Sequence, residues 1–279
     1  MSIVINFCPT GMVPTKAMNY SIPISPNEII EQTHQAYEIG ITIAHLHARL
    51  ADETPTYKQS VYQKIFEGVR KYCPELIICG SSSGRNTPEF EKRSEVIELR
   101  PDMCSLTLSS LNFMNQSSLN EPEMISNLLD KMIEYGVKPE LECFDNGMIN
   151  FGKYLLKKKN ITTPSYWNLL FGNIAGFQPT FNQIGTAISE IPKHDLVSLG
   201  GLGSSQLKVN SLAISMNLGV RVGLEDNLWF DQNKKVPATN ISLLKRIHDL
   251  LEINQKTYLE PKTLGNLGFY NKSNHLIGV

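Results

Sequence analysis

Eight short apolar runs recur along the chain, and each is followed by a segment with helical periodicity. Several runs are nearly continuous in apolar residues, as is typical of parallel strands buried on both faces. The predicted strands are Ile3–Cys8, Ile41–Ala48, Leu76–Ser81, Met103–Leu108, Lys138–Phe144, Trp167–Gly172, Asp195–Leu199 and Val220–Leu224. The predicted helices are Pro26–Ile39, Val61–Tyr72, Pro88–Leu99, Pro122–Tyr135, Met148–Lys158, Phe181–Ile191, Gln206–Met216 and Ile241–Leu251. Strict alternation of strand and helix predicts a (β/α)8 barrel, the α/β fold called a TIM barrel.

The length of the chain fits one such barrel. A TIM barrel takes about 250 residues, so we expect a single domain over residues 1–279. Pro261–Val279 follows the last predicted helix without a clear period. We interpret this segment as a C-terminal extension that packs on a neighbouring subunit.

Residues that begin and end helices mark the predicted boundaries. Ser25 and Thr87 each precede a proline at a predicted first helical position, so their hydroxyls are expected to cap these helices. Gly40, Gly136 and Gly219 are predicted to end the helices before them.

Charge and hydropathy exclude several classes of partner. With 26 basic and 27 acidic residues, the net charge is −1, which provides no field to attract nucleic acid or an anionic membrane. The chain begins without a secretory leader, and no stretch is long enough to span a bilayer. Five widely spaced cysteines in mostly apolar runs predict buried, reduced thiols. We therefore expect a cytoplasmic protein whose partners are small molecules.

Two histidines alternate at the end of the second predicted strand. His45 and His47, in AHLHAR, lie two residues apart, so both imidazoles leave the same face and can bind one metal ion. The spacing suits zinc, and barrel enzymes build their sites at the carboxyl ends of the strands. Structural histidines with ordinary hydrogen bonds are the alternative.

A dense polar cluster, VRVGLEDN, ends the eighth predicted strand. Glu225 can supply a third zinc ligand and leave a position open for substrate. Arg221 and Asp226 can form a charge pair beside it. A structural salt bridge that closes the barrel would explain the same residues.

Hydroxyl groups follow the third and fourth predicted strands. Ser81 and Ser82, in SSSGR, and Ser105 and Thr107 can hold a substrate carboxylate together with loop amides. Ordinary turn chemistry ahead of a helix is the alternative.

Two further motifs lie at predicted strand ends. Alternation points Glu140 and Glu142, in PELECFD, to one face, which favours an acid–base or hydrogen-bonding role or, alternatively, a rim ion pair with Lys138. GGLGSSQ leads into a helix whose N-terminus can bind phosphate, although tight packing of the turn explains the glycines equally.

Nine blocks in order resemble the β-keto acid cleavage enzyme family, which includes 3-keto-5-aminohexanoate cleavage enzymes. They cover nearly the whole chain and read CPTGMVPTK, IPISPNEI, AHLHAR, SSSGR, SLTLSSLNF, PELECFD, NLLFGNIAG, GLGSSQ and VRVGLEDN. SSSGR stands where many members have Ser-Thr-Gly-Gly, a departure that keeps the first serine.

The resemblance implies a homo-oligomer, usually a tetramer, with zinc at positions matching His45, His47 and Glu225. Arg221 and Asp226 match the catalytic pair. The other positions implied to contact the substrate or line its pocket include Ser81, Ser105 and Glu142.

The implied reaction condenses a β-keto acid with acetyl-CoA and releases acetoacetate and a new acyl-CoA ester. Zinc acts as a Lewis acid on the keto oxygen, which makes the carbon between ketone and carboxylate acidic. A guanidinium does not readily surrender its proton. We therefore expect Asp226 to accept the substrate proton while Arg221 positions it and stabilises charge.

The first predicted strand end bears on the side group of the keto acid. Val13 matches a position where relatives that cleave an amino-bearing substrate present a glutamate to its ammonium group. An apolar residue cannot compensate a buried cation. We therefore expect an uncharged side group, or an anionic one if Lys16 turns inward; a solvated Lys16 is the alternative.

Two other classes compete with this interpretation. A zinc-dependent TIM-barrel hydrolase also uses His-x-His, but after the first strand and with histidines from later strands. Of the remaining histidines only His194 lies near a predicted strand, and it lies at the start of that strand. A catalytically inactive binding relative is the second class, and the intact ligands and Arg–Asp pair argue against it.

Overall fold

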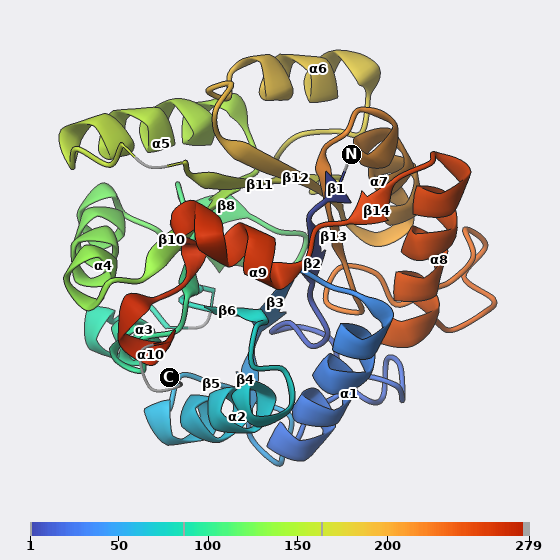
Figure 1. The fold of residues 1–279 in the computed structure, drawn as a ribbon, viewed down its shortest axis with the longest axis horizontal. Helices are drawn as coiled ribbons and strands as arrows, with labels where there is room; N and C mark the ends of the chain where they lie inside the picture. The colour runs from blue at the N-terminus through green and yellow to red at the C-terminus, as the bar shows by residue number, and fades with distance from the viewer. Residues whose placement is uncertain (1, 86, 163, 276–279) are drawn as a thin grey trace.

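The computed structural model describes residues 2–85, 87–162 and 164–275. Eight parallel strands close into a barrel in the order β10-β11-β12-β13-β2-β3-β6-β7, and helices surround it (Figure 1). The barrel strands are β2 (Ile5–Phe7), β3 (Ile43–Leu46), β6 (Ile77–Gly80), β7 (Met103–Thr107), β10 (Lys138–Cys143), β11 (Tyr166–Phe171), β12 (Leu196–Gly201) and β13 (Gly219–Val222). The predicted fold class and the order of all eight strands are confirmed.

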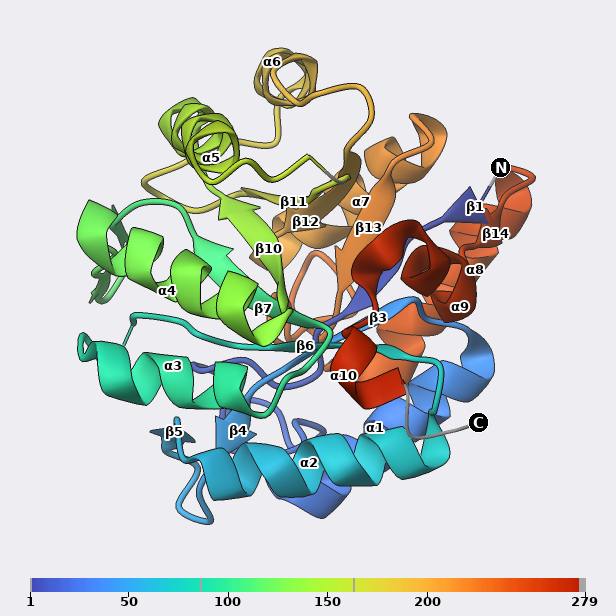
Figure 2. The same cartoon turned by 60° about the vertical axis from the view of Figure 1, so that its left-hand side comes forward.

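The surrounding helices each follow one strand of the barrel. Their bounds are α1 (Pro26–Ile39), α2 (Gln59–Tyr72), α3 (Phe90–Glu98), α4 (Pro122–Tyr135), α5 (Asn146–Lys158), α6 (Phe181–Ser189), α7 (Gln206–Ser215) and α8 (Asn240–Ile253). Figure 2 shows α2, α3 and α4 side by side on one flank. Within the described part of the chain, no helix is long and apolar enough to cross a membrane.

Short strand pairs lie outside the barrel. They are β1 (Ser2–Ile3) with β14 (Thr257–Tyr258), β4 (Ala48–Arg49) with β5 (Pro55–Thr56), and β8 (Leu111–Asn112) with β9 (Ser117–Ser118). The β8–β9 hairpin follows β7, so it extends the wall of the barrel at the end where the strands finish.

The C-terminal extension closes the other end of the barrel. It forms α9 (Pro261–Leu264), a π-helical turn (Gly265–Phe269) and α10 (Lys272–His275), and α9 crosses the centre of the ring in Figure 1. Leu264 and Phe269 are buried in one apolar cluster with residues at the starts of the strands, including Ile43, Ile77 and Met103. The described part of the extension thus packs on its own barrel, and the rest of it, residues 276–279, lies outside the described residues. Contact with a neighbouring subunit stays a prediction.

The helix boundaries confirm three of the five predicted signals. Ser25 forms a capping box with Glu28, and Gly40 and Gly136 follow the last residues of α1 and α4. Two predictions are wrong. The helix after Thr87 begins later, since Glu89 is its N-cap and accepts the first helical hydrogen bond at 3.2 Å. Gly219 is the first residue of β13, where a Cβ atom would lie 2.1 Å from Ser198 Oγ, so close strand packing explains this glycine.

All five cysteines are buried and free, as predicted.

Candidate active site

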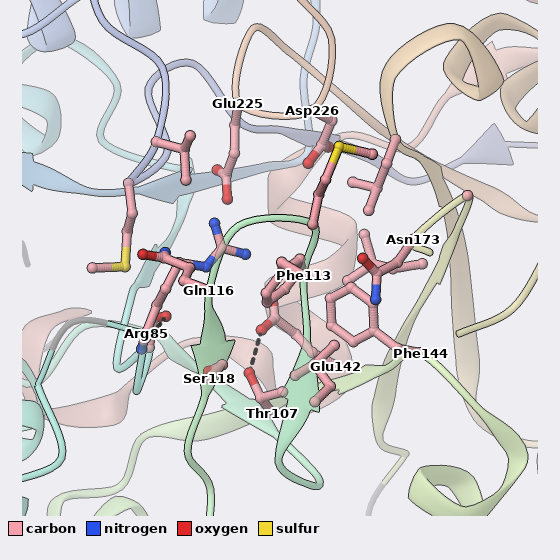
Figure 3. A pocket seen from close by; sticks show the side chains of 18 of the residues that line it. Arg85, Thr107, Phe113, Gln116, Ser118, Glu142, Phe144, Asn173, Glu225 and Asp226 are labelled. Atoms are coloured by element: carbon pink, nitrogen blue, oxygen red, sulfur yellow. Dashed lines mark hydrogen bonds between the residues drawn. The ribbon is translucent and has the colours of Figure 1, made fainter. Parts of the chain in front are cut away.

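The strands end at a cavity of about 550 Å³, which opens at the C-terminal face of the barrel (Figure 3). Most residues singled out from the sequence contribute to its wall. These are Val13, His45, His47, Ser81, Thr107, Glu142, Arg221, Glu225 and Asp226. Side chains from six different barrel strands, or from the loops that follow them, therefore meet in one site.

Two imidazoles and one carboxylate converge at the base of this cavity. His45 Nε2 lies 3.1 Å from His47 Nε2, and His47 Nε2 lies 3.2 Å from Glu225 Oε1. The other carboxylate oxygen, Glu225 Oε2, is buried and has no hydrogen-bond partner among the described residues. Three donor atoms of these residues lie within 4.8 Å of one another, as ligands of a single cation do.

Glu140 holds His45 in place from inside the barrel. Its Oε2 lies 2.5 Å from His45 Nδ1, and its Oε1 accepts hydrogen bonds from Asn6 Nδ2 at 2.6 Å and Asn168 Nδ2 at 3.0 Å. Burial raises the pKa of Glu140 and lowers that of His45, but their mutual attraction prevails and brings them to about 2 and about 9. A hydrogen bond at Nδ1 leaves Nε2 of His45 free to face the cavity.

Arg221 connects the three carboxylates of the site. Its Nε lies 2.9 Å from Asp226 Oδ2, its Nη2 lies 2.7 Å from Glu225 Oε1, and its Nη1 lies 3.4 Å from Glu142 Oε1. Burial raises the pKa of Asp226, and Arg221 opposes this rise. Burial and the nearby Glu140 also raise the pKa of Glu142. The carboxylates of Asp226, Glu225 and Glu142 thus share one guanidinium, that of Arg221.

The predicted hydroxyl groups divide into two sets. Ser81 and Thr107 line the cavity, and Thr107 Oγ1 donates to Glu142 Oε2 at 2.8 Å. Ser82 and Ser105 instead bond to each other, because Ser105 Oγ accepts from the Ser82 amide at 3.1 Å and the Ser82 hydroxyl donates to the Ser105 carbonyl. Their hydroxyls join the ends of β6 and β7, and neither residue is part of the cavity wall.

Two cationic residues near the mouth of the cavity bear on the side group of the substrate. Lys16 does not turn inward: its Nζ lies 2.6 Å from Glu28 Oε1, outside the cavity wall. Arg85, the last residue of SSSGR, does line the cavity, with its guanidinium 3.7 Å from the centre of the Phe113 ring. The sequence analysis assigned no role to Arg85, although an arginine in the loop after a barrel strand could have indicated a residue of the active site. The GGLGSSQ turn contributes Leu202 and Gly203 to the wall.

The fold and the site together indicate a TIM-barrel enzyme. At the C-terminal face of its barrel, two histidines and a glutamate that could bind a metal ion lie beside a buried Arg–Asp pair. Within this class of enzyme, residues 2–266 match the model of the beta-keto acid cleavage enzyme family. The chain therefore belongs to this family, as the nine sequence blocks predicted.

Two relatives match most of the chain. One is the 3-keto-5-aminohexanoate cleavage enzyme of Acetoanaerobium sticklandii, 33% identical over 239 residues that cover 85% of this chain and 87% of the relative. Another is the 3-oxoadipate:acetyl-CoA acetyltransferase of Cupriavidus necator, 30% identical over 253 residues, with 89% and 88% covered. These names support an enzyme that transfers acyl groups and acts on β-keto acids.

Solved structures support the fold alone. The apo structure of ObcA has a TM-score of 0.77 and 17% identity to this chain. The match covers 90% of this chain and 66% of ObcA, so the chain spans slightly less than two thirds of that structure.

Proposed function

We propose that this chain is a zinc-dependent enzyme that exchanges acyl groups between a β-keto acid and acetyl-CoA. The acetyl group moves onto the carbon between ketone and carboxylate, and the original acyl group leaves on CoA. One acid and one thioester are consumed, and acetoacetate and one new acyl-CoA are formed. The observation that carries the proposal is the convergence of His45, His47 and Glu225 beside the Arg221–Asp226 pair.

The donor set fits zinc. Two imidazole nitrogens and one carboxylate, with a cavity in front of them, match catalytic zinc sites that keep a position open for substrate. The buried, unpartnered Glu225 Oε2 is an orphaned acceptor that a cation would satisfy. The Glu140–His45 contact supplies the outer hydrogen bond that zinc-binding histidines usually make. When bound, zinc would polarise the keto oxygen and acidify the neighbouring carbon.

The chain's own residues would then move the proton. Asp226 lines the cavity and offers a carboxylate to the substrate carbon. Arg221 holds that carboxylate through two hydrogen bonds and would balance the charge that builds up as the proton leaves. The carbanion attacks the thioester carbonyl and expels the CoA thiolate. This thiolate then adds to the original ketone, and the bond between that carbonyl carbon and the central carbon breaks. The central carbon, now part of acetoacetate, takes the proton back from Asp226.

Ser81 and Thr107 are placed to receive the reacting carboxylate of the substrate. Both line the cavity together with the proposed metal ligands. The Ser81 hydroxyl can donate to a carboxylate, whereas Thr107 can do so only when the substrate replaces Glu142 as the acceptor of its hydrogen bond. Val13, 48% exposed on the cavity wall, offers no charge to a side group. Ser82 and Ser105 would support this wall through their mutual hydrogen bonds.

Metal content and turnover together test the proposal. We expect one zinc per chain after purification, and we expect loss of that zinc from a His45→Ala, His47→Ala double variant. In a panel of β-keto acids with acetyl-CoA, we expect acetoacetate to form with at least one acid. Full zinc occupancy in the double variant, or no acetoacetate from any acid, would contradict the corresponding part of the proposal.

The hydrolase alternative has no further support in the cavity. Among the described residues that form its wall, His45 and His47 are the only histidines. His248 hydrogen-bonds the Gly40 carbonyl, and the side chain of His194 is 70% exposed. An inactive relative would show zinc binding without acetoacetate formation. A tetramer and a cytoplasmic location stay predictions, and light scattering tests the first.

A further inference from the structure

Arg85 is a cationic residue of the cavity that forms no ion pair with any described residue. Arg85 lies in the loop after β6, and its side chain occupies one side of the cavity beside Gln116 and Phe113, across from Asn173 (Figure 3). Its Nε is buried and has no hydrogen-bond partner among the residues that the structure describes. Among the described residues, no carboxylate lies within 4.0 Å of its guanidinium, so stacking on Phe113 is its main contact there.

The acidic residues of the cavity are already engaged elsewhere. Glu225 and Asp226 both pair with Arg221, and Glu142 accepts from Thr107 and Arg221. These carboxylates attract Arg85 from a longer range, while burial lowers its pKa. A partly desolvated guanidinium without a paired anion is costly, because it has lost water and gained no hydrogen bond. A ligand that brings a carboxylate would remove this cost.

We propose that Arg85 binds a carboxylate at the far end of the substrate, so that the preferred substrates are β-keto acids with a second carboxylate. This inference rests on the proposed function. The planar guanidinium can donate two parallel hydrogen bonds to a carboxylate, and the Gln116 amide beside it can donate a third.

The position of Arg85 favours the distal carboxylate over the reacting one. The reacting end must lie at His45, in β3, and at His47 and Glu225, in the segments that follow β3 and β13. Arg85 instead stacks on Phe113, which belongs to the β8–β9 hairpin outside the barrel. Since Lys16 is paired with Glu28 outside the wall and Val13 is apolar, Arg85 supplies the cation that an anionic side group needs.

Matched substrates and variants test this assignment. The substrates are a β-keto diacid and the β-keto monoacid in which a methyl group replaces the distal carboxylate. Arg85→Met keeps an apolar contact with Phe113 and removes the charge, whereas Arg85→Lys keeps the charge and loses the planar fork. The control is Arg246→Met, because Arg246 also stacks on a phenylalanine, at 4.5 Å from Phe230, and also has a buried, unpartnered Nε, but lies outside the cavity.

We expect the wild-type enzyme to prefer the diacid. Arg85→Met should lower kcat/KM for the diacid by about 10- to 100-fold, the range for a lost hydrogen bond to a charged group, with little change for the monoacid. Arg85→Lys should fall between, and Arg246→Met should match the wild type. Equal losses for both acids would assign Arg85 to the reacting carboxylate and overturn the proposal. A selective rise in the KM of acetyl-CoA would assign it to a CoA phosphate and overturn it equally.

A binding measurement separates this proposal from the proposed function. Calorimetric titration with each acid, without acetyl-CoA, requires no turnover. Tighter binding of the diacid that disappears in Arg85→Met supports the Arg85 assignment even if no acid is cleaved. Equal binding of both acids by the wild-type protein overturns it, whatever the activity.

Discussion

At the scale of single residues, Asp226 and Arg221 have different proposed roles in the transfer of the substrate proton. Asp226 is held by Arg221 Nε at 2.9 Å and lines the cavity, and we propose that it takes the substrate proton. We expect Asp226→Asn to keep zinc and to lose turnover by about 100-fold or more, the usual size of general-base catalysis. Steady-state kinetics and metal analysis on the same preparation measure both effects.

Proton exchange isolates this step from the later ones. In deuterated water without acetyl-CoA, the wild-type enzyme should exchange the proton on the carbon between ketone and carboxylate, and Asp226→Asn should not. Exchange at the wild-type rate in the variant would show that another group is the base.

Glu140 is a positioning residue one step behind the proposed ligands. It is fully buried, and its Oε2 lies 2.5 Å from Nδ1 of His45, a residue of the cavity wall. Glu140→Gln keeps the shape but weakens the charged hydrogen bond, so we expect zinc affinity to fall by about 10- to 100-fold. Competition with a chromophoric chelator measures it. Unchanged zinc affinity would mean that the Glu140–His45 contact serves stability alone.

The sequence predicted those site residues whose side chains alternate along a strand. His45 and His47, or Glu140 and Glu142, lie two apart on a strand, so their shared face follows from strand geometry alone. Alternation does not indicate how far along the barrel axis a side chain lies. It therefore could not predict that Glu140 is enclosed in the barrel interior whereas Glu142 lines the cavity. Ser82 and Arg85 lie in the loop after β6, and Ser105 lies within β7. Their contacts depend on the tertiary structure, which the local sequence pattern does not determine.

At the scale of elements, the loop after β2 shapes the proposed metal site. Gly11 has a φ of 67°, and a Cβ atom there would lie 2.6 Å from Glu225 Cγ. Gly11→Ala should therefore cost about 1–3 kcal/mol in strain and should also displace Glu225, which would weaken zinc binding by about 10-fold or more. Chemical unfolding and zinc titration measure the two effects separately.

Gly136→Ala is the matched control for this loop. Gly136 has a similar φ of 71°, but its nearest neighbour would lie 3.4 Å from the new Cβ, and it ends α4 away from the cavity wall. This variant should lose stability and keep wild-type zinc affinity. Equal zinc affinity in both variants would show that the Gly11–Glu225 contact does not position the ligand.

Element boundaries were predictable where a local signal determines them. The Ser25 capping box needs only residues within one helical turn, and it forms as predicted. The glycine at position 219 has a different explanation, because a Cβ atom there would lie too close to Ser198 of the adjacent strand. Such a contact joins residues that the sequence places far apart before folding.

At the scale of the whole molecule, the two ends of the barrel have different tasks. The C-terminal ends of the strands carry the polar cavity, whereas the N-terminal ends are sealed by the extension through Leu264 and Phe269. The alternation of strands and helices predicted the barrel because each βα unit has its own sequence pattern. The extension has no such period, and its place under the barrel becomes visible only once the barrel has closed.

Phe269 is one of the two side chains through which the extension seals the barrel. Phe269 is 1% exposed, so Phe269→Ala should lower the free energy of unfolding by about 3–5 kcal/mol. Leu267, in the same turn but 49% exposed, provides the control, and Leu267→Ala should change stability by no more than about 0.5 kcal/mol. Since the seal and the cavity lie at opposite ends of the barrel, both variants should keep wild-type zinc affinity and kcat/KM well below their melting temperatures. Equal stability of the two variants would mean that the extension only rests on the barrel, and a loss of zinc affinity in Phe269→Ala alone would mean that the seal also positions the ligands.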